Sequence, residues 1–298
     1  DGDKLSITGT DTEVELVANL ILDQQYPGGQ TTIPAKKLLD ICKSLPDGGV
    51  IDFEQEENRV IIKCGRSKFN LSTLPAVEFP SLDDKKTAVQ FAIRQGYLKE
   101  LIDKTSFAMA QQDVRFYLNG MLLEVSQNRL RAVATDGHRL ALGNREILFD
   151  AEGTTQAIVP RKGITELARL FNDDDKDVVI SLSGNHIRAE TEDFRFTSKL
   201  IDAKYPDYER VLPKHGDKTI IADKDSLKQC FSRVSILSNE KYRGVRLKFE
   251  SGVLTAAANN PEQEEAEESI VINYEGSQLE IGFNVNYLLD VLSVVKSE

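Results

Sequence analysis

The stretch LRAVATDGHR, residues 130–139, is the middle member of three related segments that decide the fold. LSITGTDTEV occupies residues 5–14 and LTAAANNPEQ occupies residues 254–263, at offsets of 125 and 124 residues. Self-similarity at a nearly fixed period is the sequence signature of a repeat architecture. We therefore expect a chain built from copies of one unit.

Other segments follow the same period in the same order. Pro34 of TTIPAKKLLDICKSL and Pro160 of QAIVPRKGITELARLF are 126 residues apart, and EIGFNVNYLLDVLSVV continues the series from Glu280. STLPAVEFPSL and SKLIDAKYPDY align Pro80 with Pro206 at that same offset. These matches predict three copies, at residues 1–84, 85–212 and 213–298. The first copy lacks an opening helix and hairpin and the third lacks its last portion, so we expect part of both ends to be missing.

Hydrophobic periodicity gives the elements inside each copy. Apolar residues recur at i, i+3, i+4 and i+7 in five windows, which predicts five amphipathic helices. These windows are residues 34–45, 94–110, 160–171, 223–238 and 284–298. Alternating strands such as NRVIIKCGRSKFNLST and HIRAETEDFRFTSKL lie between them. The middle copy therefore reads β-α-β-β-β twice, an α+β fold in which two helices lie together on one face of an antiparallel sheet.

Composition narrows the class of protein. The chain has 40% hydrophobic residues and no apolar run that approaches the roughly 18 residues of a membrane span. No signal peptide is visible at the start of the sequence. The three cysteines are scattered, and Cys42 and Cys230 occupy apolar helix positions, which predicts buried free thiols and a cytoplasmic protein.

Charge is unevenly distributed along the chain. The formal net charge is −11, yet the five helical windows hold thirteen basic and eight acidic residues, a net +5 against −16 for the remainder. A basic helical face on an acidic protein favours a polyanionic partner, although an ordinary solvated helix surface remains the alternative. No zinc spacing or recognition-helix signature is present, so contacts to a nucleic acid would be to phosphates and independent of sequence.

Two segments have complementary character. In CGRSKFNLST, Arg66 and Lys68 alternate with Phe69 and Leu71. In NNPEQEEAEESIV, five glutamates fall between residues 262 and 268, and Ile236 and Leu237 end a predicted helix. Exposed strand edges of opposite charge favour a head-to-tail contact between chains, which closes a ring or extends a fibre. The acidic run could instead be a solvated loop or, with less support, a cation site.

The segment TDGHR invites a catalytic interpretation. Asp136 and His138 could orient each other while Arg139 holds an anion. A hydrolase centred here needs a third partner or a metal, and His186 and His215 occur in unrelated contexts. The alternative is a turn that presents side chains to a partner. No motif predicts a cofactor.

Five longer motifs carry a family resemblance. TDGHRL, VPRKGITEL, YPDYERVLP, LSNEKYRGVRL and NNPEQEEAEE resemble the bacterial DNA sliding clamps, the beta subunits of DNA polymerase III. The resemblance implies three clamp domains per chain and a homodimeric ring, with helices lining the hole and sheets outside. It further implies a processivity factor without catalytic activity that encircles double-stranded DNA independently of its sequence. Its expected partners are the replicative polymerase subunit, the clamp loader and repair polymerases, which bind through short linear motifs. A protein-interaction scaffold that does not bind DNA remains the alternative.

The resemblance also implies roles for individual residues. The partner-peptide cleft would be lined by Leu118, Thr135, Gly137, His138, Arg139, Leu140, Pro206, Arg210, Val211, Asn284 and Tyr287. The residues expected to face DNA are Gln112, Phe116, Tyr117, Arg161 and Lys162. The expected dimer contact joins Arg66, Lys68, Phe69 and Leu71 of one chain to Ile236 and Leu237 of the other.

Overall fold

The fold was analysed in a computed structural model that describes residues 2–82, 87–149, 153–171, 175–214 and 216–297. The chain forms two compact units, and both take part of the middle repeat. The first unit comprises residues 1–99, 124–130 and 146–202, and the second comprises residues 100–123, 131–145 and 203–298. His215 and the predicted boundary at residues 84 and 85 lie outside the described residues.

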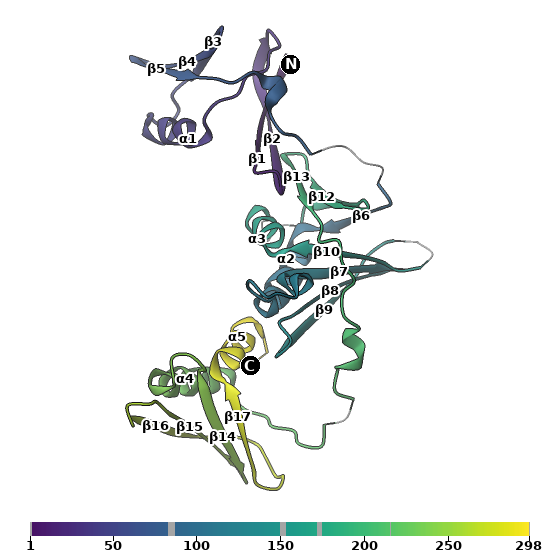
Figure 1. Cartoon of the computed structure of the whole chain (residues 1–298), viewed down its shortest axis with the longest axis vertical. Helices are drawn as coiled ribbons and strands as arrows, with labels where there is room; N and C mark the ends of the chain where they lie inside the picture. Colours follow the sequence, from purple (N-terminus) through teal and green to yellow (C-terminus); the bar gives the residue numbers. More distant parts are fainter. Residues whose placement is uncertain (1, 83–86, 150–152, 172–174, 215, 298) are drawn as a thin grey trace. The chain divides into compact units, whose positions relative to one another are not determined.

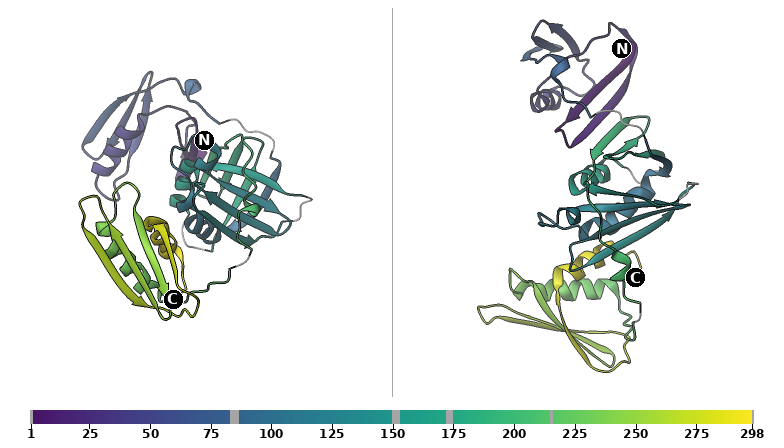
Figure 2. Two further views of the ribbon diagram at one scale, coloured as in Figure 1. Left: turned by 60° about the horizontal axis from the view of Figure 1, so that its bottom comes forward. Right: turned by 45° about the vertical axis from the view of Figure 1, so that its right-hand side comes forward.

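The first repeat contributes a hairpin, a helix and a small sheet to the first unit. Its elements are β1 (Gly2–Thr10), β2 (Val14–Tyr26), α1 (Ala35–Ser44), β3 (Asp52–Glu56), β4 (Arg59–Cys64) and β5 (Ser67–Ser72). The small sheet has the order β3-β4-β5, and α1 lies against it (Figures 1 and 2). Ile41 of α1 packs on Val60, Ile62 and Leu71, and this cluster is the local core.

The prediction that Cys42 is buried is wrong. Its side chain is exposed, whereas Cys64 and Cys230 are buried as free thiols. The stripe of α1 that meets the sheet is formed by Leu38, Ile41 and Leu45. Cys42 lies about 100° around the helix from Ile41, and within the described residues of this repeat no second helix covers that edge.

The middle repeat is β-α-β-β-β twice, as predicted. Its first half is β6 (Val89–Arg94), α2 (Gln95–Thr105), β7 (Gly120–Ser126), β8 (Arg129–Thr135) and β9 (Leu140–Glu146). Its second half is β10 (Thr155–Pro160), α3 (Arg161–Leu170), β11 (Asp177–Leu182), β12 (His186–Glu190) and β13 (Phe194–Lys199). The predicted helix stripes are buried here: Leu98, Leu101 and Ile102 on α2, and Ile164 and Leu167 on α3.

The single sheet predicted for this repeat is in fact two sheets. The opening strand of each half joins the sheet of the other half. β6 pairs with β11, and β10 lies next to β7 in the order β10-β7-β8-β9. The β11–β13 sheet continues into the first repeat through antiparallel pairing of β13 with β2, which gives the order β1-β2-β13-β12-β11-β6. The alternation within each strand therefore predicted its buried face but not its neighbours.

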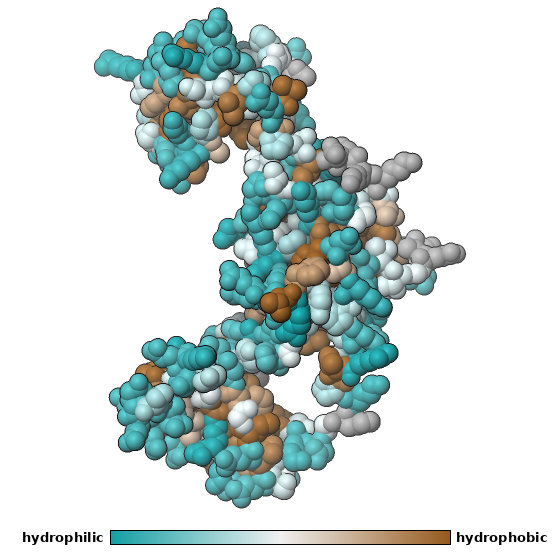
Figure 3. All heavy atoms as spheres, viewed as in Figure 1, coloured by the Kyte–Doolittle hydropathy of each residue, from teal (hydrophilic) through white to brown (hydrophobic). Residues whose placement is uncertain are grey.

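The third repeat lies wholly in the second unit. It consists of α4 (Lys224–Val234), β14 (Gly244–Glu250), β15 (Val253–Asn259), β16 (Glu265–Val271), β17 (Leu279–Asn284) and α5 (Val285–Val294). The sheet order is β16-β15-β14-β17, and α4 and α5 lie over one face of it (Figure 2). Cys230, Phe231 and Val234 of α4 pack on Leu247 and Leu254 in its core. Apolar side chains also remain exposed on β17 and α5, where hydrophobic residues gather in Figure 3.

Short 3-10 turns complete the described chain. They are η1 (Ala76–Glu78), η2 (Ser106–Ala108), η3 (Phe116–Asn119), η4 (Tyr208–Arg210) and η5 (Ser235–Leu237). None of the described helices has the length and apolar character needed to cross a membrane.

Candidate functional site

The TDGHR segment is a tight turn between β8 and β9. Asp136 Oδ1 accepts hydrogen bonds from the backbone N–H groups of His138 at 2.9 Å and Arg139 at 3.0 Å. Thr135 Oγ1 donates to the carbonyl oxygen of Arg139 at 2.6 Å and accepts from the N–H of Gly137 at 3.1 Å. Gly137 has φ +89, and a Cβ atom there would lie 2.9 Å from the Arg115 guanidinium, so the turn requires glycine.

Two side chains of this turn contact α5. The His138 ring stacks on Tyr287 with centroids 6.4 Å apart, and Arg139 lies 4.4 Å over the same Tyr287 ring. Arg139 Nη1 donates to Asp290 Oδ2 at 2.5 Å, while Nη2 donates to the Phe107 carbonyl oxygen at 2.7 Å. The side chain is only 19% exposed. The turn thus joins the middle and third repeats within the second unit.

This geometry favours presentation of side chains over catalysis. Asp136 binds backbone amides and Arg139 Nε at 3.1 Å rather than orienting the imidazole. Across the described part of the chain, no group of three or more His, Cys, Asp or Glu side chains could hold a metal ion. The hydrolase hypothesis therefore gains no support from the site.

A segment that we call the strap, residues 205–212, supplies the next group of predicted cleft residues. Tyr205 and Tyr208 are buried anchors, whereas Pro206, Arg210 and Val211 are exposed. Burial raises the pKa of Tyr205 above its usual range, so its hydroxyl stays neutral. The strap is ordered by its two tyrosines and leaves polar and apolar side chains open to a partner.

The remaining predicted cleft residues also belong to the second unit. Leu140 is half-buried at the start of β9, and Asn284 caps α5 by accepting a hydrogen bond from the Asn286 N–H at 3.0 Å. Leu118 is 2% exposed, so it supports this region from within the core. A pocket of about 440 Å³ in the third repeat is lined by Asn239, Tyr242, Gly244, Val245, Asn259, Gly282, Phe283 and Asn284.

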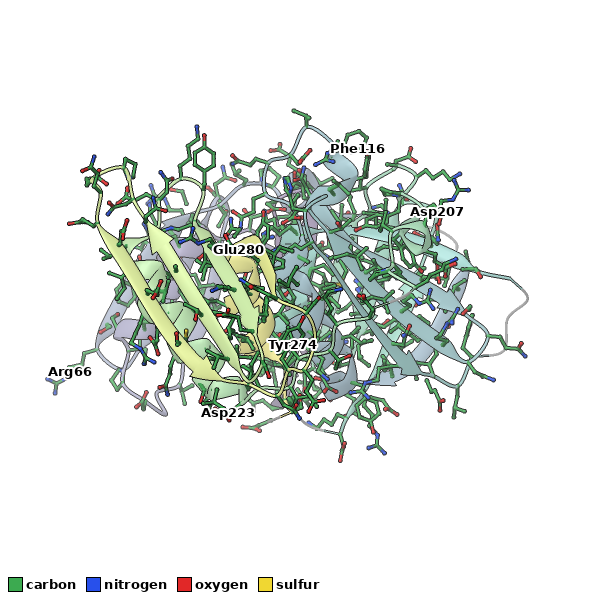
Figure 4. The ribbon with its side chains drawn as sticks, turned by 90° about the horizontal axis from the view of Figure 1, so that it is seen from below. Arg66, Phe116, Asp207, Asp223, Tyr274 and Glu280 are labelled. Atoms are coloured by element: carbon green, nitrogen blue, oxygen red, sulfur yellow. The ribbon has the colours of Figure 1, made fainter. Side chains whose placement is uncertain are left out.

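The residues predicted to face DNA fall in two places. Phe116 on η3 is 55% exposed and lies at the margin of the ribbon in Figure 4, with Tyr117 half-buried beside it. Gln112 adopts a left-handed backbone with φ 55. A hydrogen-bonded ion pair from Arg115 lowers the pKa of Asp113 to about 2, so this loop stays internally paired at neutral pH.

Arg161 and Lys162 lie in the first unit, at the first turn of α3. Lys162 Nζ forms an ion pair with Asp11 in the turn between β1 and β2. Its ammonium is thus already engaged by the neighbouring repeat, although about half of the side chain remains exposed. Arg161 is half-buried.

The residues predicted for the dimer contact lie on two sheet edges. β5 ends the order β3-β4-β5 and β16 ends the order β16-β15-β14-β17, so both predicted edges are confirmed as edges. Arg66 projects from the turn between β4 and β5 in Figure 4, and Lys68 is exposed on β5.

The apolar residues at these two edges differ in exposure. Phe69 and Leu71 face the core beneath α1, with Leu71 buried, whereas Ile236 is 72% exposed. Beside Ile236, Arg233 pairs with Glu268 of β16 at 2.5 Å.

Sequence reasoning missed three side chains that organise this region. Asp290 holds Arg139, and Phe107 supplies both a carbonyl oxygen and a ring 5.3 Å from the Arg139 guanidinium. Arg131 bonds to Tyr208 and Glu209 of the strap. Asp290 is the one acidic residue in the apolar run YLLDVL, and an isolated charge in such a run indicates a side chain with a specific partner. The sequence around Phe107 and Arg131 contains no comparable feature.

Comparison with known proteins covers every repeat. The family models described as the N-terminal, central and C-terminal domains of the DNA polymerase III beta subunit match residues 1–83, 92–207 and 209–298. The beta sliding clamp of Pseudomonas putida is 58% identical over 297 residues, covering 100% of this chain and 81% of the relative. That of Escherichia coli K12 is 52% identical over 294 residues, covering 99% and 80%.

Solved structures agree with this assignment. The crystal structure of DNA polymerase III subunit beta from Pseudomonas aeruginosa has a TM-score of 0.98 at 56% identity, covering 100% of this chain and 81% of that one. A sliding clamp from Bartonella birtlesii bound to griselimycin has a TM-score of 0.95 at 36% identity, with the same coverage. The chain therefore belongs to the family of DNA polymerase III beta subunits, the beta sliding clamps.

Proposed function

We propose that this chain performs the function of its family through three groups of residues: a partner-peptide cleft, a DNA-facing group and a dimer contact. It is a DNA sliding clamp, a non-catalytic, ring-forming processivity factor that encircles duplex DNA and tethers the replicative polymerase and other DNA enzymes. The observation that carries this function is 58% identity over 297 residues together with a TM-score of 0.98 to a solved clamp subunit. The roles of individual residues below are our proposal.

The partner-peptide cleft is proposed to lie in the second unit, around the β8–β9 turn, the strap and the start of α5. Leu140, Pro206 and Val211 offer apolar surface to anchor side chains, while His138 and Asn284 offer polar contacts. All eleven predicted cleft residues fall within this unit, which supports the assignment. The solved clamp from Bartonella birtlesii is bound to griselimycin, so a relative of this chain accepts a ligand.

The DNA-facing and dimer residues follow the same proposal. Arg161 and Lys162 would contact phosphates without reading bases, and Gln112, Phe116 and Tyr117 would lie near the DNA. The β5 edge of one chain would meet β16 and η5 of another, with Arg66 and Lys68 opposite the glutamates of residues 262–268. We further propose domains at residues 1–84, 85–212 and 213–298, and a cytoplasmic location, for which the free thiols are the support.

A single charged substitution tests the cleft. In Leu140→Asp, a docked anchor residue of the peptide would remove water from the new carboxylate, which is unfavourable. We therefore expect the affinity for a peptide with a Gln-x-x-Leu-Phe-like pattern to fall at least tenfold. The melting temperature should remain near wild type, because Leu140 is half-buried. Peptide affinity is measured by fluorescence polarisation, and stability by thermal unfolding.

Leu148→Asp is the matched control. Leu148 is 96% exposed, so the same change should leave both peptide affinity and stability unaltered. Peptide binding that survives Leu140→Asp would move the site away from this turn. Equal losses in both variants would indicate a general effect of added negative charge instead.

A further inference from the structure

The strap has little backbone support of its own. The described strap backbone contains a single 3-10 turn, η4, with Val211 N–H donating to the Tyr208 carbonyl oxygen at 3.2 Å. It is not a strand of any of the four sheets. The position of its exposed residues therefore depends on the side chains that anchor it.

Arg131 of β8 anchors the strap through its guanidinium group. Its Nη1 donates to the Tyr208 hydroxyl at 2.7 Å and to Glu209 Oε1 at 3.0 Å. Its guanidinium carbon also lies 5.8 Å over the Tyr208 ring. The guanidinium thus holds two successive strap residues, Tyr208 and Glu209, which immediately precede Arg210 in sequence.

Asn144 of β9 fixes the orientation of this guanidinium. Arg131 Nε donates to Asn144 Oδ1 at 2.9 Å, while Nη1 of the same guanidinium serves the strap. Only 12% of the Arg131 side chain is exposed, whereas Glu209 is 67% exposed, so the bond to the buried Tyr208 is less screened by solvent than the ion pair with Glu209. A lysine at this position could reach one acceptor but not reproduce the planar fork.

We propose that Arg131 is a positioning residue for partner recognition: it holds the strap so that Pro206, Arg210 and Val211 are presented to the peptide. The inference rests on the proposed cleft function, because the strap is one wall of that cleft. Arg131 itself is covered by Tyr208, Glu209 and Asn144 and does not touch the peptide. Its replacement should therefore weaken peptide binding without removing any peptide contact.

Hydrogen exchange of the ligand-free protein tests the positioning step by itself. In Arg131→Met, which keeps an unbranched side chain but no donor, the hydrogen-bonded Val211 amide of the η4 turn should exchange at least tenfold faster than in wild type. Amides in the centres of β8 and β9 should be unchanged. Arg129→Met is the control, because Arg129 is an exposed residue on the same strand.

Peptide affinity tests the consequence. Arg131→Met should weaken the Gln-x-x-Leu-Phe-like peptide about tenfold, which corresponds to about 1.4 kcal/mol at 25 °C. Arg131→Lys should restore part of the affinity, and Tyr208→Phe, which loses only the acceptor hydroxyl, should have a smaller effect. Arg129→Met should bind as wild type does.

The two measurements separate the possible failures. Unchanged strap exchange in Arg131→Met overturns the proposal, as does faster exchange throughout the second unit, which would make Arg131 a general stabilising residue. Faster strap exchange with unchanged affinity overturns the link to recognition. If the wild-type protein binds no peptide at all, the proposed cleft function fails, while the exchange result still decides whether Arg131 holds the strap.

Discussion

The arginine of the TDGHR turn is occupied within the chain. Arg139 donates to Asp290 and to the Phe107 carbonyl oxygen, and its charge lies over the Tyr287 ring. A peptide carboxylate or carbonyl would have to compete with partners at 2.5 and 2.7 Å. The residue therefore connects the third repeat to the turn, and the open surface beside it is provided by His138 and the strap.

The three cysteines predict a simple pattern of reactivity. Burial, followed by the charge of Glu268, raises the pKa of Cys230 to about 11. At pH 8 only about one thiol in a thousand would then be the reactive thiolate. Cys64 is also buried, whereas Cys42 is exposed. We expect a disulfide-exchange reagent at pH 8 to label one thiol rapidly and the other two only after unfolding.

Cys42→Ser should abolish the rapid phase and leave the slow thiols unchanged. Because a raised pKa means fewer thiolates at a given pH and the side chain is buried, Cys230 should stay unreactive at pH 8 until the chain unfolds. Two rapid thiols in the native wild-type protein would contradict the burial of Cys64 or Cys230.

For single residues, the sequence predicted local backbone conformation better than it predicted which neighbouring elements bury or bind a side chain. It offered a turn at TDGHR as an alternative to a catalytic pair, and the φ of +89 at Gly137 suits glycine in such a turn. It misjudged Cys42, because a helix pattern gives the apolar direction but not whether another element covers its edge. It missed Arg131, because an arginine within an alternating strand has no pattern that separates an anchored side chain from a solvated one.

Helix α3 shows how closely elements approach in the middle repeat. A Cβ atom on Gly163 would lie 2.5 Å from Ser198 Oγ and 3.1 Å from Val159 Cγ1. Both neighbours belong to strands against which α3 packs, so the glycine permits the close contact. The propensity gain of about 1 kcal/mol for alanine in a helix competes here with a cost of about 1–3 kcal/mol for overpacking.

We therefore predict that Gly163→Ala lowers the free energy of unfolding by roughly 1 kcal/mol, as the overpacking cost exceeds the propensity gain. Adding Ser198→Ala removes the closest atom and should recover part of the loss. Gly9→Ala is the control, since a Cβ atom there meets no atom within 4 Å. Denaturant unfolding gives the values, and a more stable Gly163→Ala would refute the packing argument.

The elements themselves were largely predictable, but the sheets were not. All five helices occur within their predicted windows, because the 3.6-residue period is a local property of the chain. The exchange of β6 and β10 between the two halves, and the pairing of β2 with β13, depend on contacts between distant segments. Periodicity reports which face of a strand is buried, and carries no information about which strand lies beside it.

The proposed contact between two chains lies at two sheet edges. Ile236 is 72% exposed in the single chain, and fully burying such a side chain contributes about 1.5–3 kcal/mol. We predict that Ile236→Ala together with Leu237→Ala raises the monomer fraction sharply in sedimentation velocity at several concentrations. Val77→Ala, at an exposed residue of η1, should leave the dimer unchanged. An unaltered dimer in the double variant would place the interface elsewhere.

Encirclement predicts a different response to salt from that of a surface binder. A protein held only by phosphate contacts loses affinity steeply as salt rises, whereas a closed ring is held by topology. We predict that the protein, loaded onto a nicked circle by a clamp loader and ATP, stays bound in high salt and is released rapidly once the circle is cut. Neutralising Arg161 and Lys162 should impair loading more than retention, because those charges guide DNA without locking it. Gel filtration of the loaded circle, before and after cutting, measures both, and equal lifetimes on circular and linear DNA would reject encirclement.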